Sequence, residues 1–165
     1  MIAALRVAGF LVGAGVVWLV VATQVPSHAR LPVAGVVPGG ILTQPFGCTS
    51  LALEPFAPFC PGHHVHTGID LAAPPGTPVH SATAGIAHRG FDAGGAGMYV
   101  VVTADQHVRL FYCHLSLYAV RDGGLVAPGD VIGQVGSTGR ATGPHVHFEI
   151  QVNGASVDPA VWLAS

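Results

Sequence analysis

The 165-residue sequence contains no lysine, so its six positively charged residues are all arginines. Charged residues make up only 8% of the chain, and the formal net charge is −2. Proteins that bind nucleic acid normally present a dense basic surface. This composition therefore gives no reason to expect a nucleic-acid partner.

The sequence also lacks a helical period. After residue 25 no window of ten or more residues has apolar side chains at helical spacing, and 23 glycines with 13 prolines would interrupt a helix. Short β-type runs occur instead, at residues 79–88, 98–104, 107–114, 131–135 and 145–152. Residues 104–106 are the expected tip of a hairpin. The length allows one domain, so we expect a single all-β domain of short antiparallel strands.

Residues 124–133 resemble the hairpins of biotinyl and lipoyl carrier domains. Such carriers attach their cofactor to a lysine amine. Because the chain has no lysine, carrier function is excluded and only the hairpin geometry is suggested.

The apolar residues are concentrated at the start of the chain, where residues 7–22 are uncharged and follow Arg6. This pattern predicts a signal peptide or signal anchor over residues 1–24. Residues 25–40, rich in proline, glycine and valine, are predicted to be a linker, and residues 41–165 form the domain. The domain is then exported, with a membrane contact only if the segment stays uncleaved.

The chain contains three cysteines. Export favours a disulfide between Cys48 and Cys60, and the alternative is two unpaired buried thiols. Cys113 lies within an apolar, strand-like run.

Ten histidines are many for so small a domain, and three groups of them stand out. In the first, His66 and Asp70 are four residues apart, roughly 13 Å along a straight strand. Both could bind one metal only if the chain bends between them, and Gly68 is the residue able to bend.

In the second group His145, His147 and Glu149 alternate with apolar residues, so they share one face of a strand, neighbours about 7 Å apart. The third group is His114 alone, at the end of a strand-like run. Together the groups indicate a metal held by His66, Asp70 and one histidine of the 145/147 pair. The other histidine and His114 are then free to move protons.

Three motifs in order, HTGID at 66–70, YCHLS at 112–116 and GSTGRATGPHVHFE at 136–149, closely resemble the lysostaphin/LytM-type zinc peptidases. The resemblance covers residues 43–160. It implies a fold of barrel-sandwich-like hairpins, one Zn²⁺ per chain, a monomer, and cleavage of peptide bonds in bacterial peptidoglycan. It also implies that His66, Asp70 and His147 are the zinc ligands and that His114 and His145 are the catalytic pair.

The sequence departs from this family at two places. Cys113 stands where many relatives have a small residue, and no tyrosine precedes His66, where well-studied members carry one. His63 and His64 are interpreted as loop residues rather than ligands. Glu149 is either a hydrogen-bond partner of a ligand imidazole or a surface carboxylate.

Two other functions are alternatives to an active peptidase. A non-catalytic relative that binds the wall or regulates another hydrolase usually lacks several ligands, whereas all five positions are filled here. A structural zinc module favours four closed, cysteine-rich ligands, and these cysteines do not have that spacing. We therefore expect a zinc endopeptidase.

Overall fold

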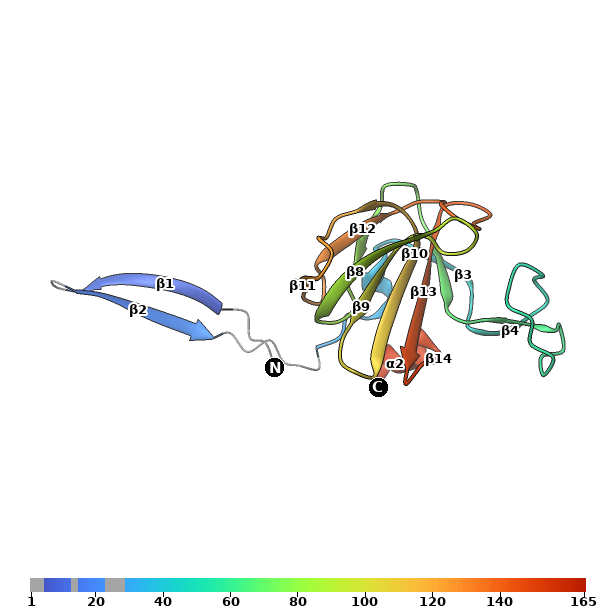
Figure 1. Ribbon diagram of the computed structural model, residues 1–165, viewed down its shortest axis with the longest axis horizontal. Coiled ribbons are helices and arrows are strands. Elements are labelled where there is room, and N and C mark those ends of the chain that lie inside the picture. Colours follow the sequence, from blue (N-terminus) through green and yellow to red (C-terminus); the bar gives the residue numbers. More distant parts are fainter. Residues whose placement is uncertain (1–4, 13–14, 23–28) are drawn as a thin grey trace.

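The computed structural model of the protein describes residues 5–12, 15–22 and 29–165 (Figure 1). Within these ranges it contains strands and two short helices, α1 (Val33–Val36) and α2 (Pro159–Ala164). The strands are β1 (Leu5–Val12), β2 (Gly15–Ala22), β3 (Ile41–Gln44), β4 (Gly47–Thr49), β5 (His64–His66), β6 (Ile69–Ala72), β7 (Pro78–His80), β8 (Gly85–Asp92), β9 (Gly97–Thr103), β10 (Val108–Tyr118), β11 (Gly124–Val126), β12 (Val131–Val135), β13 (His145–Val152) and β14 (Ala155–Val157).

Strands β1 and β2 form an antiparallel hairpin that is a separate two-stranded sheet. They lie in the stretch 1–24 that the sequence predicts to be a membrane or signal segment. Residues 1–4, 13–14 and 23–24 of that stretch lie outside the described residues. Neither described helix is long and apolar enough to cross a membrane.

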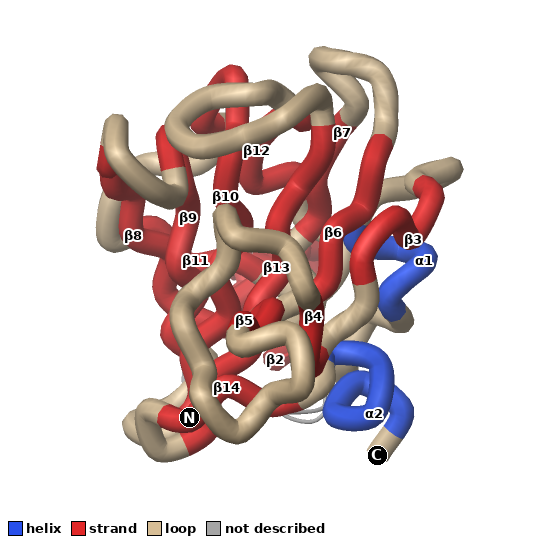
Figure 2. The backbone as a smooth tube through the Cα atoms, turned by 90° about the vertical axis from the view of Figure 1, so that its right-hand side faces the viewer, coloured by secondary structure: helices blue, strands red, loops and turns tan. Residues whose placement is uncertain are grey.

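The main sheet has ten strands, all paired antiparallel. Seven of them lie side by side in the order β11-β8-β9-β10-β13-β6-β3. Strand β12 pairs with β10 and β7, and β14 pairs with β13. Figure 2 shows the strands curving around one body, with both helices at its side. This arrangement confirms the mainly antiparallel β fold expected from the sequence.

The core follows from the alternation of side chains along the central strands. On β13, Val146, Phe148 and Ile150 are fully buried, and the residues between them are only partly buried. From β10, Leu110 and Tyr112 enter the same core, where the rings of Tyr112 and Phe148 lie 5.0 Å apart. Burying each such side chain contributes about 1.5–3 kcal/mol, so β10 and β13 form the rigid base from which the polar face is presented.

The packed domain starts ahead of residue 41. Val36 and Val37, within the segment predicted to be a linker, are almost fully buried in the core. The backbone nitrogen of Leu31 also donates to the carbonyl of Ala82 at 2.7 Å. The composition of this segment, rich in proline, glycine and valine without a period, does not predict the burial of these side chains. Their burial depends on contacts with residues distant in the sequence.

Residues 79–88, expected to be one strand, belong to two. Strand β7 pairs with β12, whereas β8 pairs with β9 and β11. The chain turns between them, where the Ser81 hydroxyl donates to the carbonyl of Thr83. The expected runs 131–135 and 145–152 coincide with β12 and β13. Ala104 and Asp105 hold the β9–β10 turn through bonds to Val108, as the predicted hairpin tip requires.

Strands β4 and β5 form a small two-stranded sheet of their own at the base of a projecting segment (Figure 1). We call residues 47–66 the finger. A disulfide joins Cys48 to Cys60 within it, which confirms the predicted pairing. Cys113 is a buried free thiol on β10.

Candidate active site

Three side chains from three strands meet at one point. His66 ends β5, Asp70 lies on β6, and His147 lies opposite Asp70 in the pairing of β13 with β6. His66 Nε2 is 3.1 Å from Asp70 Oδ1 and 3.0 Å from His147 Nδ1, and the last two atoms are 3.1 Å apart. These are the three residues that the family resemblance implies as metal ligands.

The bend expected between His66 and Asp70 is present. Strand β5 ends at His66 and β6 begins at Ile69. A Cβ at Gly68 would lie 2.4 Å from the carbonyl oxygen of Phe148, which is closer than any side chain tolerates. Glycine therefore lets β13 approach the bend, and this approach brings His147 to the other two donors.

The outer partners of the two imidazoles fix which nitrogens carry protons. His66 Nδ1 lies 2.9 Å from the carbonyl oxygen of Pro45, which can only accept, so Nδ1 donates and Nε2 presents a lone pair. His147 lies between two carboxylates, with Nε2 3.7 Å from Glu149 Oε2 and Nδ1 3.1 Å from Asp70 Oδ1. Burial would lower the pKa of His147, but its hydrogen bonds to Asp70 and Glu149 raise it to about 9, so Nδ1 donates to Asp70 when no ion is bound. Release of that proton would leave three acceptors facing one another.

A divalent cation fits this arrangement. Ligand atoms around a tetrahedral zinc, with bonds of 2.0–2.1 Å, lie about 3.3 Å apart, and the three donors here are 3.0–3.1 Å apart. Two imidazole nitrogens and one carboxylate oxygen are donors that suit zinc. Three protein ligands also leave a coordination position open, as a hydrolytic site requires.

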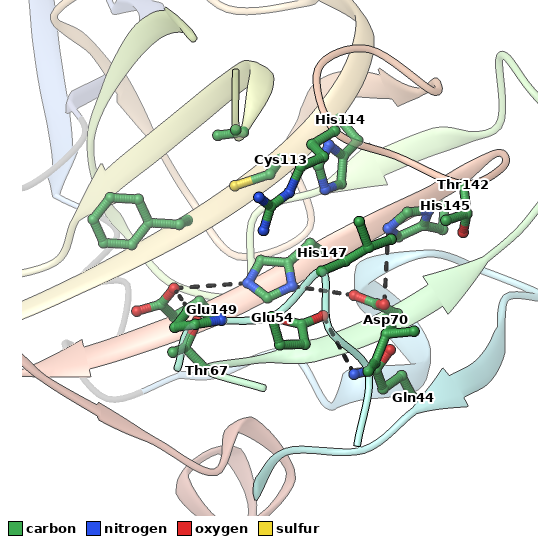
Figure 3. Close-up of a pocket in the computed structure, with 17 residues that line it drawn as sticks. Gln44, Glu54, Thr67, Asp70, Cys113, His114, Thr142, His145, His147 and Glu149 are labelled. Atoms are coloured by element: carbon green, nitrogen blue, oxygen red, sulfur yellow. Dashed lines mark hydrogen bonds and ion pairs between the residues drawn. The ribbon is translucent and has the colours of Figure 1, made fainter. Parts of the chain in front are cut away.

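Glu149 is more than a surface carboxylate. Figure 3 shows His147 between Asp70 and Glu149. Burial alone would raise the pKa of Glu149, but hydrogen bonds, first from His147 and then from neighbouring side chains, lower it to about 2. The structure therefore favours the interpretation of Glu149 as the group that orients the His147 ring.

His114 and His145 lie beside the three donors. Their ring centroids are 4.7 Å apart, and His145 Nε2 is 3.8 Å from Asp70 Oδ2. Each Nδ1 is 2.8 Å from a carbonyl oxygen, that of Thr138 for His114 and that of Gly143 for His145. The carbonyls fix the Nδ1 proton, so each neutral ring has Nε2 free to accept one.

A β-bulge turns His114 toward the site. Between Tyr112 and Leu115 the pairing of β10 with β9 shifts by one residue, and His114 has a φ of 62°. This backbone conformation is uncommon outside glycine. As a result Leu115 enters the core, whereas Cys113 and His114 both line the site. Strand alternation in the sequence gave no sign of the bulge.

The charge state of the site follows from its surroundings. Burial lowers the pKa of His114, and the neighbouring histidines lower it further, against the opposing effect of its bond to Thr138. Burial would raise the pKa of Asp70, but hydrogen bonds from His147 and His66 hold it below its usual value. At neutral pH His114 is therefore neutral and Asp70 is ionised.

The site opens into a cleft of about 310 Å³. One wall belongs to the finger, and the loop between β12 and β13 contributes Arg140 and Thr142. Four finger residues line the cleft: Leu51, Leu53, Glu54 and Pro55. All five predicted site residues lie in or at this cleft.

Two other sequence features lie away from the donors. His64 Nδ1 is bonded to the carbonyl of Glu54, and His63 is exposed, so neither joins the three-donor group. His63 lies in a loop as predicted, whereas His64 begins β5 rather than lying in a loop. Among the described residues that line the cleft there is no tyrosine.

Two imidazoles and a carboxylate that converge on a β-sheet, with two further imidazoles beside them, are the arrangement of a metal-dependent hydrolase. Residues 64–159 match the model of Peptidase family M23. The match covers more than half of the chain, and the chain belongs to this family. The resemblance to the lysostaphin/LytM-type peptidases is thereby confirmed.

Named relatives agree with this assignment. The chain is 41% identical over 125 residues to the DD-carboxypeptidase/endopeptidase Mpg of Neisseria meningitidis, a match that covers 73% of this chain and 29% of that protein. It is 41% identical over 93 residues to the peptidoglycan DD-endopeptidase ShyA of Vibrio cholerae, covering 56% of this chain and 22% of the relative. The chain thus spans less than a third of either relative.

Solved structures share the fold. The catalytic domain of the antimicrobial peptidase lysostaphin from Staphylococcus simulans superposes with a TM-score of 0.63 at 32% identity. That match covers 77% of this chain and 94% of the lysostaphin domain. The likeness therefore extends over a whole catalytic domain.

Proposed function

We propose that the protein is a zinc-dependent endopeptidase that hydrolyses peptide bonds in bacterial peptidoglycan. The observation that carries this proposal is the convergence of His66 Nε2, Asp70 Oδ1 and His147 Nδ1 beside two imidazoles with free Nε2 atoms. The names of the relatives support the substrate, since they include a peptidoglycan DD-endopeptidase.

The five site residues would have two kinds of role, metal binding and proton transfer. His66, Asp70 and His147 would hold the ion, which would act as a Lewis acid and lower the pKa of the attacking water. The imidazoles of His114 and His145 present Nε2 to the cleft. One would accept the proton of the attacking water at Nε2 and later return it to solvent. The other would take up a proton from solvent, donate a hydrogen bond to the oxyanion and then give that proton to the leaving amine.

We further propose that the protein acts outside the cytoplasm. Peptidoglycan lies there, and the disulfide between Cys48 and Cys60 is typical of an oxidising compartment. Residues 1–24 would serve as the signal peptide or anchor, with a membrane contact only if they are retained. We expect the active unit to be a monomer because one chain supplies all five site residues.

Digestion of purified peptidoglycan tests the proposal. Incubation with zinc-loaded protein should release peptide fragments detectable by mass spectrometry, and a chelator should stop the release. His147→Ala should be inactive, whereas His64→Ala, which alters a histidine outside the donor group, should retain activity. Undiminished cleavage by His147→Ala would refute the proposed function.

A further inference from the structure

The side chain of Thr138, on the loop between β12 and β13, joins that loop to two strands. Its hydroxyl accepts a hydrogen bond from the backbone nitrogen of Met98 on β9 at 2.9 Å. The same hydroxyl donates to the carbonyl of Leu115 on β10 at 2.8 Å. A threonine hydroxyl has one proton to donate and lone pairs with which to accept, and this one is used in both ways. Thr138 therefore ties the loop to β9 and β10 at once.

The two partners of this hydroxyl lie at the β-bulge that turns His114 toward the site. Leu115 directly follows His114 and pairs with Met98 just after the shift in register between β9 and β10. His114 itself has a φ of 62°, which a side chain other than glycine rarely adopts. Its backbone nitrogen donates to the carbonyl of Ala96 at 2.8 Å. The Thr138 hydroxyl thus bridges the two strands at the point where the bulge closes.

The main chain of Thr138 contacts the imidazole of His114. The Thr138 carbonyl oxygen lies 2.8 Å from His114 Nδ1, and a carbonyl can only accept, so Nδ1 carries the proton and Nε2 is free. One residue therefore acts on His114 in two ways. Its hydroxyl holds the backbone beside His114, and its carbonyl fixes the ring and the position of the ring proton.

The loop can hold His114 in this way only because it packs closely against β9. A Cβ at Gly97 would lie 2.4 Å from Thr138 Oγ1, closer than real side chains come. Gly97 also has a φ of 64°, a conformation that glycine adopts without strain. The glycine at this position therefore lets the Thr138 hydroxyl reach the backbone nitrogen of Met98.

We infer that Thr138 is a positioning residue whose hydroxyl holds the bulge and its own carbonyl in place, so that His114 presents a free Nε2 to the cleft. This inference rests on the proposed function. Among the described residues, Thr138 makes no side-chain hydrogen bond to the three metal-ligand candidates. Its effect should therefore reach the reaction through the orientation of His114 and not through the ion.

Replacement of the hydroxyl tests the inference. Thr138→Val keeps the shape of the side chain and removes both hydroxyl bonds, whereas Thr138→Ser keeps the hydroxyl. Thr77→Val is the matched control, because the Thr77 hydroxyl also donates to a carbonyl, that of Pro74 at 2.7 Å, and lies outside the cleft.

Three quantities are measured for each protein. They are kcat of the zinc-loaded form on a soluble cross-linked peptide from peptidoglycan, zinc affinity by calorimetry, and the proton position on the His114 ring. Long-range ¹⁵N–¹H NMR of the zinc-loaded protein reports the last, and the His114 signals are assigned by their absence from His114→Asn.

We expect Thr138→Val to lower kcat about tenfold to a hundredfold, the usual cost of a misplaced catalytic group. Its His114 signals should shift from the Nδ1–H form toward the Nε2–H form, because the carbonyl that fixes the proton is no longer held. Thr138→Ser and Thr77→Val should match wild type in both respects, and zinc affinity should be unchanged throughout. In the His114→Asn background, Thr138→Val should cause no further loss of kcat, because it acts through the imidazole.

Wild-type kcat in Thr138→Val, or His114 signals like those of wild type, would overturn the inference and leave the proposed function standing. Three other results would also overturn it: an equal loss of kcat in Thr138→Ser, weaker zinc binding by Thr138→Val, or a further loss of kcat in the His114→Asn background. The serine variant decides the matter even where the valine variant is too unstable to measure. If wild type cleaves neither peptide nor peptidoglycan, the proposed function fails, and the His114 signals alone then show whether the Thr138 hydroxyl positions this ring.

Discussion

Glu149 lies on the side of the His147 ring away from Asp70 and accepts hydrogen bonds from three other side chains. Thr67 Oγ1 is 2.9 Å from its carboxylate, and Gln151 Nε2 and Ser156 Oγ are each at 2.7 Å. A carboxylate held in this way cannot rotate freely. It therefore fixes the ring whose other nitrogen points at the proposed ion.

This bonding makes stability depend on pH. The pKa of Glu149 falls from 4.5 to about 2 on folding, so its ionised form stabilises the fold above pH 4.5, and the contribution is lost as the pH falls through 2. In the metal-free protein we expect the difference in free energy of unfolding between wild type and Glu149→Gln to shrink by up to about 3 kcal/mol between pH 6 and pH 2. Urea denaturation measures it, and a difference independent of pH would contradict this role.

His114 combines a catalytic imidazole with an unusual backbone conformation, and one substitution separates the two. Asparagine tolerates a φ of 62° far better than most residues. His114→Asn should therefore unfold at nearly the wild-type temperature while kcat falls about 10²- to 10⁴-fold. His114→Val, β-branched and strained at this φ, should lose stability as well. Near-normal kcat in His114→Asn would exclude a role in proton transfer.

Among the elements, the finger is held by its disulfide, the short β4–β5 pairing and backbone hydrogen bonds between its own residues, such as those from Ala57 to His63 and from Val65 to Pro55. Its loop carries one wall of the cleft, including Leu53 and Glu54. Replacing Cys48 and Cys60 by serine should lower kcat/KM through loss of this wall and reduce the free energy of unfolding by about 3 kcal/mol. Peptide cleavage and urea denaturation measure the two effects.

Alkylation of the cysteine thiols provides a control for the disulfide experiment, because it shows which of the three cysteines are accessible in the folded protein. Burial raises the pKa of Cys113 to about 12, and the charges of Glu149 and Asp70 add to this. After mild reduction of the native protein, alkylation should therefore modify Cys48 and Cys60 and leave Cys113 intact. Mass spectrometry counts the labels, and three labels on folded protein would show that the thiol on β10 is accessible.

At the scale of elements, the sequence predicted what local periodicity encodes. The alternation of apolar and polar residues along 145–152 predicted β13 and its polar face, and Gly68 indicated the bend before β6. It missed the break between β7 and β8, which depends on pairing with different partner strands. The bulge at His114 was also invisible, because a single left-handed residue leaves the apolar pattern of its neighbours unchanged.

For the whole molecule, the five site residues were named from motifs, and the structure brings them together from strands far apart in the chain. Spacing alone left open whether His145 or His147 joins the donors. The register of β13 on β6 sets His147 opposite Asp70. The burial of Val36 and Val37 and the partner of Glu149 likewise depend on contacts that no local stretch of sequence contains.

Zinc titration of metal-stripped protein by calorimetry tests most directly whether the fold builds one metal site from His66, Asp70 and His147. We predict that wild type and His114→Asn each bind one equivalent of zinc tightly, because His114 is not a ligand, and that His66→Ala and His147→Ala lose tight binding. Wild-type protein that binds no zinc, or ligand variants that bind it as tightly as wild type, would contradict the account.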